Sequence, residues 1–166
     1  MLDKMVQLVK EFPNAQFVVA GVDSLPESIY TPARAAGIKI VFDQTYDLLS
    51  HATAAVVTSG TATLETALFR VPQIVVYRTS TVTYAIAKRL IRVPFISLPN
   101  LIAEREVVKE LIQDDFSVEN LKFELQKIFT NVVYKGEMLQ GYDLIQDKIG
   151  EGSASHTAAN LILEKS

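Results

Sequence analysis

The sequence predicts an α/β protein with a Rossmann-like, doubly wound parallel sheet of about five strands. Two observations support this fold class. Short, mostly apolar runs alternate with segments of helical periodicity along the first two-thirds of the chain. These runs do not alternate between apolar and polar residues, which is typical of parallel strands covered on both faces. Helix replaces strand after Leu101, so the last third is expected to be a helical C-terminal tail.

The predicted strands share a length of about four or five residues and end at turn residues. They span Gln16–Ala20, Ile38–Phe42, Ala55–Thr58, Gln73–Tyr77 and Phe95–Leu98. The predicted helices repeat apolar residues every three or four positions. They span Leu2–Phe12, part of Pro26–Gly37, Thr45–Ala52, Thr61–Phe69, Val82–Ile91, Glu106–Gln113, the segment opened by Ser117, Lys135–Ile149 and Ser153–Glu164. Asp43 or Thr45 is expected to cap the third of these helices. We therefore divide the chain into an α/β domain, residues 1–131, and a tail, residues 132–166.

Composition narrows the class of protein. A chain of 166 residues fits one domain with an appended tail, and the lack of cysteine excludes disulfides and thiolate metal sites. The net charge of −3 argues against a nucleic-acid partner. The charged N-terminus is no signal peptide, and no apolar run is long enough to span a membrane, which is compatible with a cytoplasmic location.

The charge is unevenly distributed along the chain. Between Thr66 and Ala103 there is no acidic residue. The same stretch holds five basic residues, Arg70, Arg78, Lys88, Arg89 and Arg92. This block predicts either a positive face for an anionic partner or ordinary solvated helix surfaces.

The turn Ser59-Gly60-Thr61 is the strongest candidate for a binding site. It lies between a buried strand and a helix, where ligands bind to open parallel sheets. The first N–H groups of a helix are unpaired and carry a partial positive charge, which suits a phosphate. Gly60 lets a ligand approach the backbone, and the hydroxyls of Ser59 and Thr61 can cap the helix or donate to phosphate. The alternative is an ordinary helix N-terminus.

Three further residues are candidates near this turn. Glu65 lies on the same helix face as Thr61, outside the spacing of a capping box, and can accept from ribose hydroxyls or simply complement the helix dipole. Asn100 follows Pro99 and the expected strand Phe95–Leu98, so its amide can reach a diphosphate or a base, or form a turn. Arg78 ends the strand Gln73–Tyr77 and lies near the same mouth.

The sequence contains no recognisable catalytic centre. His51 and His156 lack metal-ligand spacing, and Asp114-Asp115 is typical of a solvated helix end, so we predict no metal site. There is no P-loop, dinucleotide fingerprint or nucleophile elbow. No residue is identified as a general base, and no cofactor is implied.

Four segments together resemble one family. They are TSGTATLETAL, VPQIVVYR, TYAIAKRLI and VPFISLPNLIAEREVVKELIQDD. In this order they are similar to the C-terminal half of bacterial lipid-A-disaccharide synthases, over about Val18 to Gln126. The resemblance implies one half of a GT-B glycosyltransferase. That family transfers 2,3-diacylglucosamine from its UDP derivative to a diacylglucosamine 1-phosphate acceptor, by metal-independent inverting chemistry.

The resemblance also implies roles for the candidates. The C-terminal half of such enzymes holds UDP, which makes residues 1–131 a nucleotide-sugar-binding domain. It places the diphosphate near Ser59, Gly60 and Thr61, the ribose near Glu65, and further contacts around Asn100, while Arg78 matches a motif position. The substrates imply location at the inner face of the bacterial inner membrane, with anionic lipid as a further partner of the basic block.

The sequence departs from the family pattern in two respects. The N-terminal half, which is expected to supply the general base and the acceptor site, does not precede Met1, so this chain by itself is expected to be inactive. Glu104 stands where the family commonly has glycine. Without the other half, the tail is expected to pack on its own domain or to exchange with a second copy in a homodimer. Two other interpretations stay open: half of another GT-B-like enzyme such as a UDP-sugar epimerase, and a non-catalytic binding module.

Overall fold

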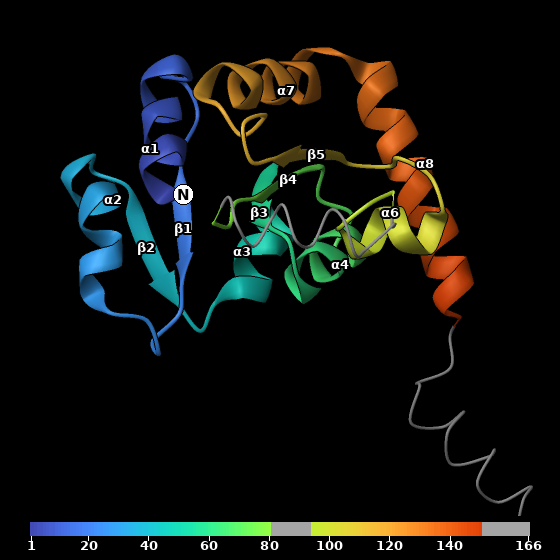
Figure 1. The fold of residues 1–166 in the computed structure, drawn as a ribbon, viewed down its shortest axis with the longest axis horizontal. Coiled ribbons are helices and arrows are strands. Elements are labelled where there is room, and N and C mark those ends of the chain that lie inside the picture. Colours follow the sequence, from blue (N-terminus) through green and yellow to red (C-terminus); the bar gives the residue numbers. More distant parts are fainter. Residues whose placement is uncertain (81–93, 151–166) are drawn as a thin grey trace, which may run out of the picture.

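The computed structural model describes residues 1–80 and 94–150 and confirms the predicted class of fold (Figure 1). Within these residues, parallel strands alternate with helices. The strands are β1 (Val18–Gly21), β2 (Lys39–Phe42), β3 (Ala55–Thr58), β4 (Gln73–Tyr77) and β5 (Lys109–Ile112). Every strand pair among them is parallel, as buried βαβ units require.

The strands form two sheets where one was expected. β1 pairs with β2, and the second sheet has the order β3-β4-β5. Ala55 lies opposite Gln73, and Ile74 lies opposite Lys109, so β4 is the central strand of the larger sheet. Helix α4 contacts β3 and β4, while α7 contacts β4 and β5. Figure 1 shows these two helices on opposite faces of that sheet.

The helices agree with most of the predicted segments. They are α1 (Leu2–Glu11), the 3-10 turn η1 (Glu27–Tyr30) with α2 (Thr31–Ala35), α3 (Thr45–His51), α4 (Thr61–Leu68), α6 (Leu98–Ala103), α7 (Val118–Thr130) and α8 (Val132–Ile149). The predicted helices Val82–Ile91 and Ser153–Glu164 lie outside the described residues. Ser117 caps α7 as expected, because its side chain accepts from the amide of Asn120 at 3.1 Å. The cap expected for α3 was wrong: Gln44 is the N-cap, and no side chain bonds there.

The strand predicted at Phe95–Leu98 was wrong. Leu98 begins helix α6, with Pro99 in its first turn, where proline is tolerated because that N–H needs no helical partner. The amides of Ile96 and Ser97 donate to the carboxylate of Glu110 instead of to a neighbouring strand. A side chain therefore takes the place of the expected strand partner.

The helix predicted at Glu106–Gln113 was also wrong, and so was the expectation that no strand follows Leu101. Lys109–Ile112 is strand β5, paired along its whole length with Ile74–Tyr77. Lys and Glu have low strand propensity, but pairing with a buried neighbour overrides propensity over so short a segment. The fifth strand thus exists, later in the chain than predicted.

One hydrophobic core connects the α/β part of the chain to α8. Ile74, Val75 and Val76 from β4 are fully buried in the same cluster as Met138 and Ile145 from α8. Helix α8 also contacts α4, α6 and α7. The described part of the tail, residues 132–150, therefore packs on its own domain. This is the first of the two arrangements expected from the sequence, the other being exchange with a second copy.

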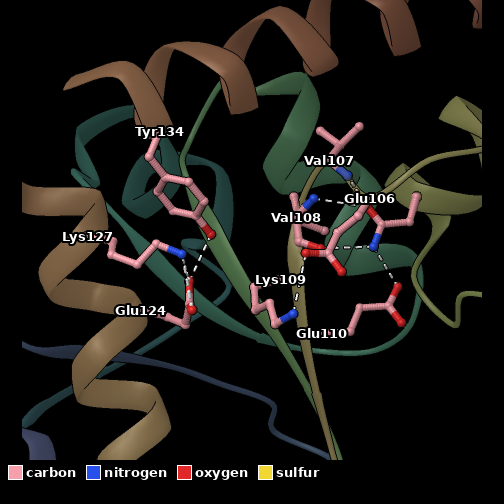
Figure 2. A network of polar contacts seen from close by, with 9 residues as sticks. Glu106, Val107, Val108, Lys109, Glu110, Glu124, Lys127 and Tyr134 are labelled. Carbon is pink, nitrogen blue, oxygen red and sulfur yellow. Dashed lines mark hydrogen bonds and ion pairs between the residues drawn. The ribbon is translucent and has the colours of Figure 1, made fainter. Parts of the chain in front are cut away.

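Polar contacts also attach α8 to the domain. The buried Tyr142 hydroxyl donates to the carbonyl of Val71 at 3.1 Å and accepts from the side-chain amide of Gln73 at 3.4 Å. Burial raises the pKa of Tyr142 above its ordinary value. Nearer the start of α8, the Tyr134 hydroxyl donates to Glu124 on α7 at 2.9 Å, and Lys127 bonds the same carboxylate (Figure 2). Burial, aided by the hydrogen bond to Glu124 and its charge, raises the pKa of Tyr134 too.

The basic stretch is only partly within the described residues. Arg70 forms an ion pair with Asp143 of α8, and Arg78 is exposed beyond β4. Lys88, Arg89 and Arg92 lie outside the described residues. No helix in the described part of the chain is both long and apolar enough to cross a membrane.

The Tyr142 contacts generate a stability prediction. Tyr142→Phe leaves the Val71 carbonyl buried without its donor, so we expect a loss of about 1–3 kcal/mol in the free energy of unfolding. Tyr46→Phe is the matched control, because Tyr46 is exposed and should tolerate the change. Urea denaturation measures both free energies of unfolding.

Because the folded-state pKa of Tyr142 is raised, the wild-type chain should lose stability as pH rises above ~10, and Tyr142→Phe should lose less.

Candidate functional site

The turn at Ser59-Gly60-Thr61 lies at the carboxyl end of β3, where helix α4 begins. Gly60 is the N-cap of α4, with φ 155° and ψ −167°, a conformation that essentially only glycine adopts. A Cβ atom on Gly60 would meet no other atom within 4 Å, so the backbone faces open space. Gly60 and Thr61 are both exposed, and no side chain caps the helix. The start of α4 is thus accessible to a ligand.

The first turn of α4 is held from within. The hydroxyl and the amide of Thr63 both bond the carbonyl of Gly60, at 2.7 and 3.2 Å. Thr63 itself is fully buried, so it anchors the turn from the protein side. The amides ahead of it, at Thr61 and Ala62, belong to the orphan donors of a helix N-terminus. These are the groups that can bind an anion.

Both donors of Ser59 are engaged inside the protein. Its amide donates to the carbonyl of Val76 in β4 at 3.0 Å, and its hydroxyl donates to the carbonyl of Ile96 at 3.0 Å. Ser59 therefore offers a ligand only the acceptor side of its hydroxyl. The contact with Ile96 brings a segment 37 positions later in the chain against the turn.

Glu65 lies half-buried on α4 and lines a pocket with the start of α3. This pocket has a volume of about 500 Å³ and is lined by Asp43, Gln44, Thr45, Tyr46, Asp47 and Glu65. Asp43–Asp47, which comprises the two residues before α3 and the first turn of that helix, was not a candidate site in the sequence. Its position directly after strand β2 was the signal that identifies it, because loops at the carboxyl ends of parallel strands line ligand sites.

The pocket is rich in acceptors and includes one exposed aromatic ring. Asp43, Asp47 and Glu65 supply carboxylates, which suit hydroxyl groups of a sugar. Tyr46 stacks on Phe69 of the neighbouring segment with ring centroids 5.3 Å apart. In the described residues, no cluster of three or more His, Cys, Asp or Glu side chains is placed to hold a metal ion.

Asn100 was expected to follow a strand and to face a ligand, and the position after a strand was wrong. It belongs to helix α6, is fully buried, and uses its side chain within the protein. Its oxygen accepts from the amides of Val107 and Val108 at 2.7 and 2.9 Å, and its nitrogen donates to the carbonyl of Val108 at 2.9 Å and to Glu110 at 2.8 Å. Figure 2 shows Val107, Val108 and Glu110 on this network.

Two further residues were noted in the sequence, Arg78 and Glu104. Arg78 is exposed just beyond β4, and its neighbour Thr79 is held on both backbone groups by the side chain of Gln113. Glu104, at the position noted for glycine, adopts a left-handed conformation with φ 57°, which explains why glycine suits it. Ser59, Gly60, Thr61 and Glu65 thus lie on one turn and the helix that follows it, whereas Asn100 is linked to Ser59 through Glu110 and Ile96.

The parallel strands, the intervening helices and the glycine turn at the carboxyl end of β3 define a Rossmann-like α/β protein. The comparison with known proteins gives the particular family. The model of the Lipid-A-disaccharide synthetase family matches residues 1–161, so the chain belongs to this family.

Individual relatives agree with this assignment. Two Lipid-A-disaccharide synthases, from Geobacter sulfurreducens and Myxococcus xanthus, are each 34% identical over 167 residues, which is 99% of this chain and 44% of the relative. The Lipid-A-disaccharide synthase of Acidobacterium capsulatum is 44% identical over 110 residues, 66% of this chain and 28% of its own. The chain therefore spans less than half the length of these curated relatives.

The geometry of Gly60 generates a second prediction. Gly60→Ala should destabilise the chain by about 1–3 kcal/mol, because alanine at this φ and ψ is strained although its methyl group meets no atom. Gly136→Ala is the matched control. Gly136 lies inside α8 with open space around it, so alanine there should stabilise by about 0.5–1 kcal/mol. Urea denaturation should give opposite signs, and a stabilised Gly60→Ala variant would contradict this account of the turn.

Proposed function

We propose that this chain is the part of a lipid-A-disaccharide synthase that binds the UDP portion of a UDP-diacylglucosamine donor. Family membership supports the enzyme class. The observation that carries the proposal for the site is the exposed start of α4, where Gly60 leaves the backbone open and no side chain caps the helix. Such a terminus favours a diphosphate, because unpaired N–H groups and the helix dipole act on the same charge.

In this proposal the diphosphate binds at Gly60 and Thr61. The amides of Thr61 and Ala62 donate to it, the Thr61 hydroxyl adds a donor, and Ser59 shapes the turn. Arg78, exposed beyond the adjacent strand, contributes positive charge at the mouth. UDP gains negative charge as it leaves the sugar, so fixed donors at this position lower the barrier of the transfer.

The nucleoside lies in the pocket beside Glu65. Glu65 accepts from the ribose hydroxyls, and Asp43–Asp47 at the start of α3 forms the other wall. For Asn100 we propose an indirect role, because its amide is buried and used by Val107, Val108 and Glu110. It holds the segment that contacts Ser59.

This chain covers 44% of the length of the relative from Geobacter sulfurreducens, so we propose that other parts of such enzymes are needed for the complete reaction. We propose that the acceptor, a phosphorylated diacylglucosamine, and the general base belong to the part of the relatives that this chain does not span. The 166-residue chain alone should then bind UDP without transferring sugar. We further propose that the enzyme works at the inner face of the inner membrane, where its lipid substrates reside, and that a homodimer forms through the C-terminal tail, residues 132–166.

A UDP titration followed by amide NMR tests the binding proposal. We expect the largest shift changes at Gly60, Thr61 and Glu65. No response to UDP would favour the non-catalytic binding module, and shifts confined to other elements would reject this site.

The role of Glu65 has a sharper test. Glu65→Gln should weaken UDP binding roughly 10- to 100-fold, the range expected for losing hydrogen bonds to a charged group. The loss should be much smaller for 2′-deoxy-UDP, because the hydroxyl in question is absent. The control is Glu137→Gln, the same substitution at a glutamate on a different helix, α8. This variant should bind both nucleotides like the wild type. If Glu65→Gln weakened the binding of UDP and of 2′-deoxy-UDP equally, Glu65 would not bond the 2′-hydroxyl of the ribose.

A further inference from the structure

Glu110 stands out because its carboxylate collects hydrogen bonds from one short segment. It lies in the middle of β5 and is half-buried. It accepts from the amide of Ile96 at 3.0 Å, from the amide and hydroxyl of Ser97 at 2.9 and 2.6 Å, and from the side chain of Asn100 at 2.8 Å. Hydrogen bonds to an ionised acceptor are about twice as strong as neutral ones. This carboxylate is therefore the main polar anchor of residues 96–100.

The anchor replaces a helix cap. Ser97 is the N-cap of α6, but its hydroxyl does not bond the helix and donates to Glu110 instead. The carboxylate of a neighbouring strand thus occupies the positive end of α6, which it stabilises electrostatically. A carboxylate suits this position because both of its oxygens face N–H or O–H donors.

The same peptide reaches the glycine turn. The amide of Ile96 donates to Glu110, and the carbonyl of Ile96 accepts from the hydroxyl of Ser59 at 3.0 Å. Ser59 is the residue before Gly60, and its amide is held by Val76. Ile96 therefore links the Glu110 carboxylate to the side chain of Ser59 through its two backbone groups.

Asn100 gives the segment a second attachment to the same strand region. Its oxygen accepts from the amides of Val107 and Val108, and its nitrogen bonds both Val108 and Glu110 (Figure 2). These hydrogen bonds attach the segment 96–100 to residues 107–110, which lead into and begin β5. β5 is in turn paired with the buried strand β4.

We propose that Glu110 is a positioning residue that holds the Ile96–Ser97 backbone against Ser59 and so sets the geometry of the Gly60 turn. It touches no ligand in this proposal and acts through two hydrogen bonds in series. Its consequence for UDP rests on the proposed function, whereas its consequence for the free protein does not.

The first test uses the free 166-residue chain. Glu110→Gln turns one acceptor into a donor that faces Ile96 and Ser97. We expect amide NMR shifts at these two residues and also at Ser59, Gly60 and Thr61. Glu106→Gln is the control, since Glu106 is exposed on the same segment and forms an ion pair with Lys109; it should leave the turn unchanged. Changes at Ile96 and Ser97 that stop short of the turn would overturn the proposal.

Ser59→Ala keeps the proposal testable if Glu110 variants fold poorly. It removes only the second bond of the series, so it should reproduce the shifts at Gly60 and Thr61 and spare Asn100. An unchanged turn in Ser59→Ala would also overturn the proposal.

The coupling between Glu110 and Ser59 in UDP affinity supplies a readout that general loosening of the fold would not produce. Glu110→Gln should weaken UDP binding about tenfold, the equivalent of one hydrogen bond. In the Ser59→Ala background the same change should have little further effect, because the link is already broken. Additive losses would show that Glu110 does not act through Ser59. If the wild-type chain binds no UDP, the proposed function fails, while the shifts of the free protein still decide the role of Glu110.

Discussion

The central strand β4 is the constraint on which the described structure depends. Gln73, Ile74, Val75 and Val76 are fully buried, and β3 and β5 pair along its two edges. Its carbonyls reach beyond the regular pairing, because Val76 accepts from Ser59 and Tyr77 accepts from Gln113. The ends of both neighbouring strands are thereby fixed at one edge of the sheet, which is the edge where the candidate site lies.

The two neighbours of β4 contribute different parts of this edge. β3 leads into the glycine turn and α4, with exposed backbone at Gly60 and Thr61. β5 supplies Glu110, whose carboxylate accepts hydrogen bonds from Ile96, Ser97 and Asn100. In our proposal, the exposed groups that bind a ligand are separate from the half-buried Glu110 and the buried Asn100 that orient them. Preorganised donors of this kind lose little free energy to reordering when an anion binds.

Helix α8 shows how far the domain extends along the chain. The division at residues 131 and 132 coincides with the junction of α7 and α8, yet Met138, Tyr142 and Ile145 lie in the same core as β4. Gly141 lies so close to Val107 that any Cβ would collide with its side chain. The middle of α8 is therefore part of the same core as the elements before it.

Local patterns predicted the central elements well. The bounds of Ala55–Thr58 and Gln73–Tyr77 agree with the structure, because buried parallel strands have a strong apolar signal and clear turn residues at their ends. The start of α7 at Ser117 was also predicted correctly, because a helix cap depends on a contact only three residues away along the chain. The family was also recognisable from four short motifs, and the family comparison agrees.

The errors occurred where distant residues decide the structure. Phe95–Leu98 has an apolar pattern typical of a strand, but the carboxylate of Glu110 takes its amides, and Lys109–Ile112 becomes a strand by pairing with β4. Asn100 was identified as a notable residue, but its burial and its hydrogen bonds were not predictable, because the partners come from residues 107–110. The place of Asp43–Asp47 in a pocket was not predictable either, because the remaining lining residue, Glu65, comes from the separate helix α4.

By itself, the sequence determined the fold class, the glycine turn before α4 and the family, since each depends on residues adjacent along the chain. The tertiary structure decided which strand lies beside β4, where the hydroxyl of Ser59 points and what Asn100 bonds. Those outcomes depend on hydrogen bonds between separate segments, such as the one from Ser59 to Ile96 across 37 positions, and local propensity carries no information about such partners.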